Sequence, residues 1–146
     1  MKKGNVETLQ RFRVRIETWV RRTLDKHPRT GIGVTRFVLP LGRRYVVKMP
    51  VPFNWLHFLQ GLQGNVHEAV FSKHLVDVFP ICPVVASIPG GFLNVMPRAE
   101  AITEDQLTKE VRQKWGMWKD MAIPIEIKRN NFGVLDGRVV VVDYGG

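Results

Sequence analysis

The pattern of apolar and polar positions predicts several short strands in the first two thirds of the chain. Residues 44–49 place one lysine, Lys48, directly after two β-branched valines in a largely apolar run that is typical of a strand. Two further apolar runs, at 84–86 and 92–95, flank a Pro-Gly-Gly segment and predict a pair of strands joined by a turn. These runs indicate a small sheet.

Apolar residues recur at helical spacing in two other segments. Residues 65–75 have this spacing, and Asn65 is a suitable N-cap for a helix that begins there. A second helix is predicted over 103–121, where Thr103 and Gln106 have the spacing of a capping box. Strands and helices together predict an α+β fold.

Residues 130–145 contain two short apolar strands joined by Asp136-Gly137. An Asp-Gly pair suits a two-residue hairpin turn, because both central residues must accept positive φ. The hairpin would bring Asn131, before its first strand, near Asp143, after its second. An amide and a carboxylate supply the hard oxygen ligands that Mg²⁺ prefers. An ordinary surface hairpin is the alternative interpretation.

Lys48 and Glu68 are two further candidates for a functional site. A lysine among apolar strand residues must reach an anion or extend its ammonium group to water, and a nucleotide phosphate is one such anion. Glu68 lies in the first turn of the predicted helix, where the helix dipole alone favours an acid. Taken singly, Lys48 is better interpreted as an exposed lysine of an edge strand.

Lys48, Glu68, Asn131 and the segment Asp143-Tyr144-Gly145 follow one another in the order found in kinases. In these segments the chain resembles the protein kinase-like superfamily, and most of all the small kinase-like proteins of phages and bacteria related to aminoglycoside and lipopolysaccharide kinases. The resemblance extends over roughly residues 31 to 145 and includes the twelve-residue step from Asn131 to Asp143.

The resemblance implies ATP and Mg²⁺ as cofactors and suggests a role for each candidate residue. Lys48 would contact nucleotide phosphates, and Glu68 would orient Lys48. Asn131 and Asp143 would hold Mg²⁺. The backbone of the segment Val95-Met96-Pro97 would meet the adenine at a hinge.

Gly31 and Gly33 stand where such proteins have a phosphate-binding glycine loop. They form G-x-G rather than a full G-x-G-x-x-G, and a simple turn explains them equally well.

Two departures from the family pattern restrict the expected chemistry. Glu126 stands five residues before Asn131, where the family has its catalytic aspartate. Its extra methylene moves the carboxylate by about a bond length, and a misplacement of roughly 1 Å can lower a rate on the order of a hundredfold. The sequence also stops at Gly146, so we expect one truncated kinase-like domain over 1–146 without an activation segment or a C-terminal lobe.

Composition restricts the picture further. The chain has 146 residues, of which 45% are hydrophobic, enough for one domain with one core. No apolar stretch approaches the roughly 20 residues of a membrane span, and no signal sequence is visible. We therefore expect a cytoplasmic protein, in the host cytoplasm if a phage encodes it. The single cysteine, Cys82, is interpreted as a small packed residue rather than a nucleophile.

The formal charge of +9 is concentrated in residues 1–29, where nine basic and three acidic side chains give +6. We predict a basic helical extension there. Its basic face suits the phosphates of nucleic acid or an acidic partner protein, and a solvated face without a partner explains it equally well.

Residues 50–62 are rich in aromatic side chains. If exposed, they would form a partner-binding surface or a patch that touches a membrane. If covered, they would pack against the N-terminal helix, which is the interpretation we prefer.

We therefore predict an α+β domain with the antiparallel sheet of a kinase-like N-terminal lobe, a hinge and a metal-binding hairpin. The leading functional prediction is a catalytically impaired, pseudokinase-like protein that keeps a nucleotide cleft. It would act by binding a partner protein, such as a host protein that a phage targets. The alternatives are an active ATP-dependent phosphotransferase with Glu126 as base, and a nucleic-acid-binding protein that uses the basic N-terminal helix.

Overall fold

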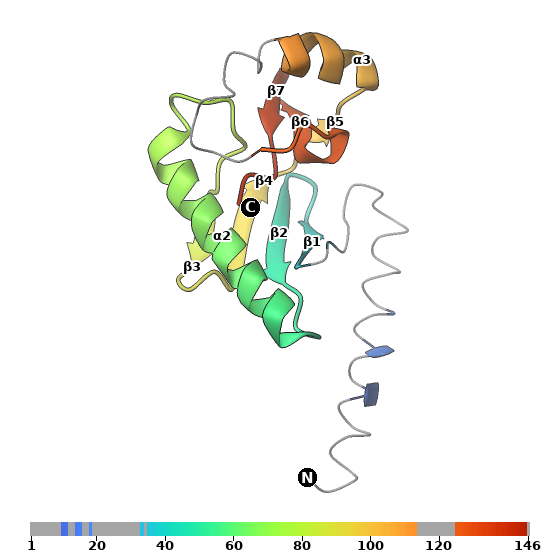
Figure 1. The fold of residues 1–146 in the computed structure, drawn as a ribbon, viewed down its shortest axis with the longest axis vertical. Helices are drawn as coiled ribbons and strands as arrows, with labels where there is room; N and C mark the ends of the chain where they lie inside the picture. The colour runs from blue at the N-terminus through green and yellow to red at the C-terminus, as the bar shows by residue number, and fades with distance from the viewer. Residues whose placement is uncertain are drawn as a thin grey trace, which may run out of the picture.

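The computed structural model describes residues 33, 35–113 and 125–145, together with Gln10, Arg11, Val14, Arg15 and Thr18 (Figure 1). These residues form two sheets with antiparallel strands, and helices beside them, so the fold is α+β as predicted. Gln10, Arg11, Val14, Arg15 and Thr18 are helical and exposed. The rest of the basic extension predicted over 1–29 lies outside the described residues.

The larger sheet contains the predicted lysine strand. It has four strands in the order β1-β2-β4-β3, and every neighbouring pair is antiparallel. Its strands are β1 (Arg36–Leu41), β2 (Tyr45–Pro50), β3 (Ala86–Ile88) and β4 (Leu93–Pro97). Lys48 lies opposite Val38 on one side and Asn94 on the other, so it belongs to an inner strand. The interpretation of Lys48 as an edge lysine is therefore wrong.

Helix α2 (Trp55–Leu75) packs against this sheet and begins earlier than predicted. Its N-cap is Asn54, whose side chain accepts a hydrogen bond from the His57 amide at 3.1 Å. Asn65 is therefore not an N-cap but a buried residue in the middle of the helix. Gly61 and Gly64, which precede Asn65, also lie inside α2. A Cβ atom on Gly61 would overlap the Thr35 carbonyl oxygen, so glycine permits close approach of α2 to the sheet.

The smaller sheet contains the predicted C-terminal hairpin. Its strands β5 (Glu100–Ala101), β6 (Phe132–Leu135) and β7 (Arg138–Val141) pair in that order. Asp136 and Gly137 have φ angles of 51° and 75°, which confirms the two-residue turn with positive φ at both positions. A short 3-10 helix, η3 (Arg129–Asn131), leads into β6.

The predicted capping box at the start of the second helix is present. The Thr103 hydroxyl accepts from the Gln106 amide at 3.1 Å, and the Gln106 side chain accepts from the Thr103 amide at 2.9 Å. Helix α3 (Glu104–Gln106) then widens into a π-helix, η1 (Leu107–Arg112). No glycine or proline in this segment signals the wider turns. The remainder of the helix predicted to residue 121 lies outside the described residues.

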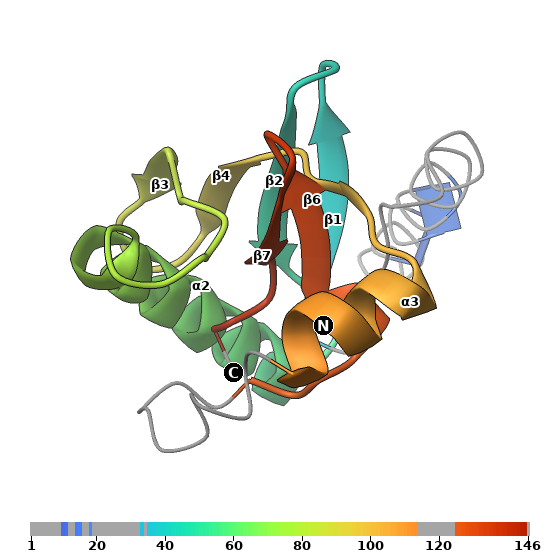
Figure 2. The same cartoon turned by 90° about the horizontal axis from the view of Figure 1, so that it is seen from above.

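The main core lies where β6 and β7, the start of η1 and the segment around Cys82 meet. In the view from above, α2 and α3 lie on opposite sides of β6 and β7 (Figure 2). Phe132, Val141 and Tyr144 are fully buried there. Cys82 is also buried, which confirms its interpretation as a packed residue. A second, smaller cluster on the larger sheet contains Phe37, Leu39 and Val51.

The aromatic segment predicted to be covered is largely exposed. From Trp55 onward it forms the first turns of α2, and Trp55 is 72% exposed. The interpretation of this segment as core packing is therefore wrong for Trp55 and its neighbour Leu56. Among the described residues, no helix combines the length and the apolar character that a membrane crossing requires.

Candidate functional site

Lys48 and Glu68 form a buried ion pair between β2 and α2. The Lys48 Nζ atom lies 2.7 Å from Glu68 Oε1, and both residues are almost completely buried. Successive strand residues point to opposite faces of the sheet, and the Lys48 side chain is on the face that α2 covers. Glu68 lies on the buried face of α2 and points toward Lys48. The pairing expected from the resemblance is thus present in the structure.

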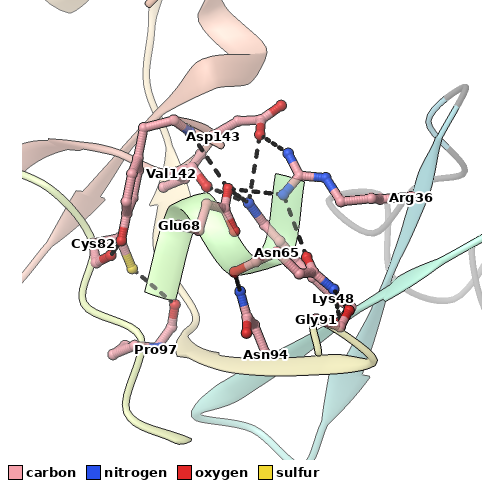
Figure 3. A network of polar contacts seen from close by, with 11 residues as sticks. Arg36, Lys48, Asn65, Glu68, Cys82, Gly91, Asn94, Pro97, Val142 and Asp143 are labelled. Carbon is pink, nitrogen blue, oxygen red and sulfur yellow. Dashed lines mark hydrogen bonds and ion pairs between the residues drawn. The ribbon is translucent and has the colours of Figure 1, made fainter. Parts of the chain in front are cut away.

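Asp143 joins this pair from the end of β7. Lys48 Nζ donates to the Val142 carbonyl oxygen at 2.6 Å and lies 3.7 Å from Asp143 Oδ1 (Figure 3). The Tyr144 amide, one residue further, faces Glu68 Oε1 at 3.4 Å. The hairpin therefore brings the predicted carboxylate to the lysine, although the two positions are far apart in the sequence.

Arg36 is a fourth member of the cluster and was not predicted. Its guanidinium bonds to Asp143 Oδ1 and lies 3.1 Å from Glu68 Oε1 (Figure 3). It is as deeply buried as Lys48. Two cations, Lys48 and Arg36, and two carboxylates, Glu68 and Asp143, therefore share one small region, and their formal charges cancel. We call these four residues the charge cluster. An arginine at the start of an otherwise apolar strand was the only signal in the sequence.

Two asparagines connect the cluster to the backbone of the sheet. Asn65 Nδ2 donates to the carbonyl oxygens of Lys48, at 3.1 Å, and Gly91, at 2.9 Å. Asn94 Nδ2 donates to the Asn65 carbonyl oxygen at 2.8 Å. Because both asparagines are fully buried, these bonds hold α2 and the sheet in one register.

Two buried oxygen atoms in this region have no hydrogen-bond partner within the described part of the chain. They are Oε2 of Glu68 and Oδ1 of Asn94. Glu68 Oε1, in contrast, faces Lys48, Arg36 and the Tyr144 amide at once. An unsatisfied buried oxygen raises the free energy of the site, and a polar group that enters the site could relieve this.

The charges of the cluster shift the acid–base behaviour of its members. Burial alone would lower the pKa of Arg36, but Glu68 and Asp143 outweigh this effect and raise it. Burial alone would raise the pKa of Asp143, whereas Lys48 and Arg36 outweigh it and lower the pKa. Both groups are therefore held in their charged forms.

Asn131 and Glu126 lie near each other, but their side chains do not face the charge cluster together. The Asn131 side-chain nitrogen donates to the Glu126 carbonyl oxygen at 2.8 Å. The Glu126 carboxylate is exposed and lies 2.6 Å from Lys128 Nζ. The Asn131 carbonyl oxygen accepts from the Val142 amide at 2.8 Å, which places Asn131 beside the residue that precedes Asp143.

The other predicted site residues lie as follows. Gly31 is outside the described residues, and Gly33 is exposed in a turn before β1, where its amide donates to the Arg36 carbonyl oxygen at 2.7 Å. The segment Val95-Met96-Pro97 ends β4, and its backbone pairs with β2. Val95 also accepts from the Val85 amide at 2.8 Å. A role of these residues in nucleotide binding stays a prediction.

Tyr144 and Cys82 close the buried side of the site. The Tyr144 hydroxyl donates to the Cys82 carbonyl oxygen at 2.6 Å. Burial raises the pKa of the Tyr144 hydroxyl and raises that of the Cys82 thiol to about 11. Burial therefore favours the neutral forms of both groups.

Glu68 and Asp143 already neutralise the two cations of the cluster, so an anion could bind there only by displacing a carboxylate. No group of three or more His, Cys, Asp or Glu side chains gathers within the described ranges. Lys48 and Arg36 supply two buried cations, while Asp143 remains 47% exposed and accessible from solvent. A ligand that carries several negative oxygens could displace Asp143 from the two cations or bridge them.

Asp143→Asn should alter the pH dependence of stability. A carboxylate whose pKa is lowered by folding stabilises the protein above its ordinary pKa, and this contribution is lost as the pH falls through the folded value. We expect the wild type to exceed the variant by about 1 kcal/mol near neutral pH, since solvent screens the half-exposed side chain. The difference should shrink as the pH falls below the ordinary pKa of an aspartate and through its lowered folded value. Urea unfolding across this range measures it.

Asp105→Asn is a suitable control for that experiment. Asp105 forms an exposed ion pair with Lys109 at 3.1 Å. Its replacement should change stability little at any pH. Equal pH profiles for the two variants would contradict the proposed stabilisation of the Asp143 carboxylate.

Comparison with known proteins adds no assignment, because no protein-family model and no curated protein sequence matches the chain.

Proposed function

We propose that the protein is a catalytically impaired, kinase-like protein that keeps a nucleotide-type cleft and acts by binding a partner protein. The observation that carries the proposal is the convergence of Lys48, Glu68 and Asp143 from β2, α2 and the end of β7. In the family that the sequence resembles, such a trio orients the nucleotide phosphates and their metal ion.

The position of Arg36 supports the impaired character. Its guanidinium bonds to Asp143 Oδ1, a carboxylate oxygen that would otherwise be available to a divalent cation. Any Mg²⁺ ion must compete with an arginine that Glu68 and Asn65 also hold in place. The exposed ion pair between Glu126 and Lys128 is a second obstacle, because the candidate base does not point into the charge cluster.

The residues fit ATP better than they fit the metal ion. Lys48 and Arg36 would meet its phosphates. Asp143 and Asn131 would hold Mg²⁺, which would neutralise phosphate charge when bound. For this, Arg36 must release Asp143.

Titration with ATP is the direct test. We expect ATP at about 100 times its dissociation constant to stabilise the fold by about 2.7 kcal/mol. For a domain of this size, that corresponds to an increase in Tm of about 5–10 °C. Because Arg36 occupies Asp143, Mg²⁺ should add little to this effect. Thermal shift and calorimetry, each with and without Mg²⁺, measure both quantities.

The outcomes separate the proposal from its alternative. No binding at millimolar ATP would remove the nucleotide cleft. Transfer of labelled phosphate to a protein, lost in both Asp143→Ala and Lys48→Ala, would instead indicate an active phosphotransferase. Circular dichroism of the variants must show that they fold, since Lys48 is buried in an ion pair.

The partner would be a cellular protein, and a host protein if a phage encodes the chain. This part of the proposal rests on the resemblance to small kinase-like proteins of phages and bacteria.

A further inference from the structure

Much of helix α2 departs from the usual amphipathic arrangement, although Phe71 and Leu75 near its end pack against the main core. Its buried residues are small or polar, namely Gly61, Gly64, Asn65, Glu68 and Ser72. Several of its large apolar residues are exposed instead, namely Trp55, Leu56, Leu59, Val66 and Val70. A helix normally turns its apolar side chains to the core. The inward face of α2 therefore serves the charge cluster and close packing, and the apolar residues need another explanation.

The exposed residues form a continuous stripe rather than scattered positions. Trp55, Leu59, Val66 and Val70 follow one another at steps of four, seven and four residues. At 100° per residue these steps keep them on one side of α2, nearly opposite the buried glycines and Glu68. The stripe is about 22 Å long, since each helical residue rises 1.5 Å.

The turn between β3 and β4 extends this stripe at one end. Phe92 is 52% exposed, and its ring lies 6.4 Å from that of Phe58, which stacks on Trp55 at 5.8 Å. Gly91 fixes the turn against α2, because a Cβ atom there would overlap the Leu62 carbonyl oxygen. We call the surface made by Phe92 and by the exposed α2 residues Trp55, Leu56, Leu59, Val66 and Val70 the outer face of α2.

The outer face is costly to leave in water. Burial of one large apolar side chain stabilises a protein by roughly 1.5–3 kcal/mol, and exposed apolar patches of this kind mark interaction sites. The spacing of the stripe matches the seam along which two helices pack. The shape and spacing favour a helix as the occupant.

The charges around the stripe indicate the chemistry of that helix. Glu68 is the only acid in α2, and it is buried. The outer part of the helix instead carries the cation Lys73 and the exposed histidines His67 and His74, which count as neutral at pH 7, and the exposed Asp77 follows the helix. A second copy of the chain would bring a formal charge of +9 against another +9, and the N-terminal segment 1–29 is itself basic. A partner with acidic residues complements this surface, whereas the chain itself does not.

We propose that the outer face of α2 binds an amphipathic helix of a partner protein, with acidic residues beside its apolar stripe. This inference rests on the proposed role as a partner-binding protein and names the binding surface and the class of partner. It does not depend on nucleotide, because the charge cluster lies on the opposite side of α2.

Two synthetic peptides test the chemistry. Both have the length of α2 and a leucine stripe at helical spacing, one with flanking glutamates and the other with lysines at the same positions. We expect the glutamate peptide to bind at least about tenfold more tightly in fluorescence anisotropy, with an affinity that falls as salt rises. Equal binding of the two peptides, or no binding, would overturn the assignment of an acidic partner.

Leu59→Asp tests the surface, and Leu41→Asp is its matched control. The two leucines are 43% and 49% exposed, but Leu41 lies at the end of β1, away from the stripe. Leu59→Asp should weaken binding of the glutamate peptide at least about tenfold, and Leu41→Asp should leave it unchanged. Both variants should keep the melting temperature within a few degrees, since neither side chain is buried. If both variants lost the same affinity for the glutamate peptide, the outer face of α2 would not be its binding site.

Photo-cross-linking in the natural cell extract identifies the occupant. A photoreactive residue at position 63, exposed beside the stripe, should cross-link to an acidic amphipathic segment of another protein. Cross-links to a second copy of the chain, to residues 1–29, or to lipid would each overturn the proposal.

The nucleotide titration of Leu59→Asp distinguishes the two proposals. Retained ATP stabilisation with lost peptide binding supports both. Peptide binding without any effect of ATP supports the surface and removes only the nucleotide cleft.

Discussion

Glu68→Ala is expected to lower the free energy of unfolding by about 3–5 kcal/mol. Glu68 is fully buried and lies within 3.1 Å of two cations, Lys48 and Arg36. Its removal leaves Asp143 as the one remaining carboxylate for two buried positive charges. Asp143 already bonds to Arg36 and lies 3.7 Å from Lys48, and its half-exposed side chain cannot neutralise both cations. Urea unfolding followed by circular dichroism measures the loss.

Glu104→Ala is the matched control for this experiment. Glu104 also pairs with an arginine, Arg112, at 3.6 Å, but both side chains are more than half exposed. We expect this variant to change stability by less than about 1 kcal/mol. If Glu68→Ala were no more harmful than Glu104→Ala, the buried cluster would not contribute to the stability of the fold.

Gly91→Ala is expected to lower stability by about 3 kcal/mol, the second largest effect. Gly91 has a φ angle of 81°, and a Cβ atom would overlap the Leu62 carbonyl oxygen. Relief of that overlap would move α2 away from the turn and lengthen the bond from Asn65 to the Gly91 carbonyl oxygen. The midpoint of thermal or urea unfolding would report the loss.

Gly42→Ala separates the backbone strain of a positive φ angle from the overlap of the new Cβ atom with α2. Gly42 also has a positive φ, 66°, but open space surrounds its position. Only the backbone strain remains there, about 1–2 kcal/mol. Equal losses in the two variants would mean that contact between the turn and α2 is unimportant.

Local sequence signals predicted the elements that are stabilised by interactions between residues close together in the chain. Asp136 and Gly137 specify a hairpin by their backbone preferences, and the turn forms as expected. Thr103 and Gln106 specify a helix start by reciprocal hydrogen bonds. Such signals need no knowledge of the rest of the chain, which is why they were sufficient.

The orientation of α2 could not be predicted by the same reasoning. A pattern of apolar residues predicts which side of a helix is buried only when the buried side is apolar. In α2 the buried side holds Asn65 and Glu68, whose partners lie on β2, β4 and the end of β7. Tertiary hydrogen bonds and ion pairs thus override the local preference. Asparagine is a common N-cap, so local preference alone placed Asn65 at the helix start, whereas its tertiary bonds place it inside α2.

Arg36 was missed because its role depends on strand register. Side chains two residues apart in a strand share one face, so Arg36 shares a face with Val38, which lies opposite Lys48. The sequence does not reveal that register in advance. Lys48 and Glu68 were found because a family pattern placed them together, whereas no such pattern included the arginine.

The distance along the chain between Arg36 and Asp143 has a consequence for protein synthesis. The two residues are 107 positions apart, so Arg36, Lys48 and Glu68 leave the ribosome long before Asp143 is made. During this interval the nascent chain has two cations against one carboxylate at the interior of its first sheet. The β1–β2 hairpin and α2 can form early, but the complete cluster must wait for the β6–β7 hairpin. A chain cut short before Asp143 would lack one of the two carboxylates that balance the cations, and we expect it to be less stable than the full chain.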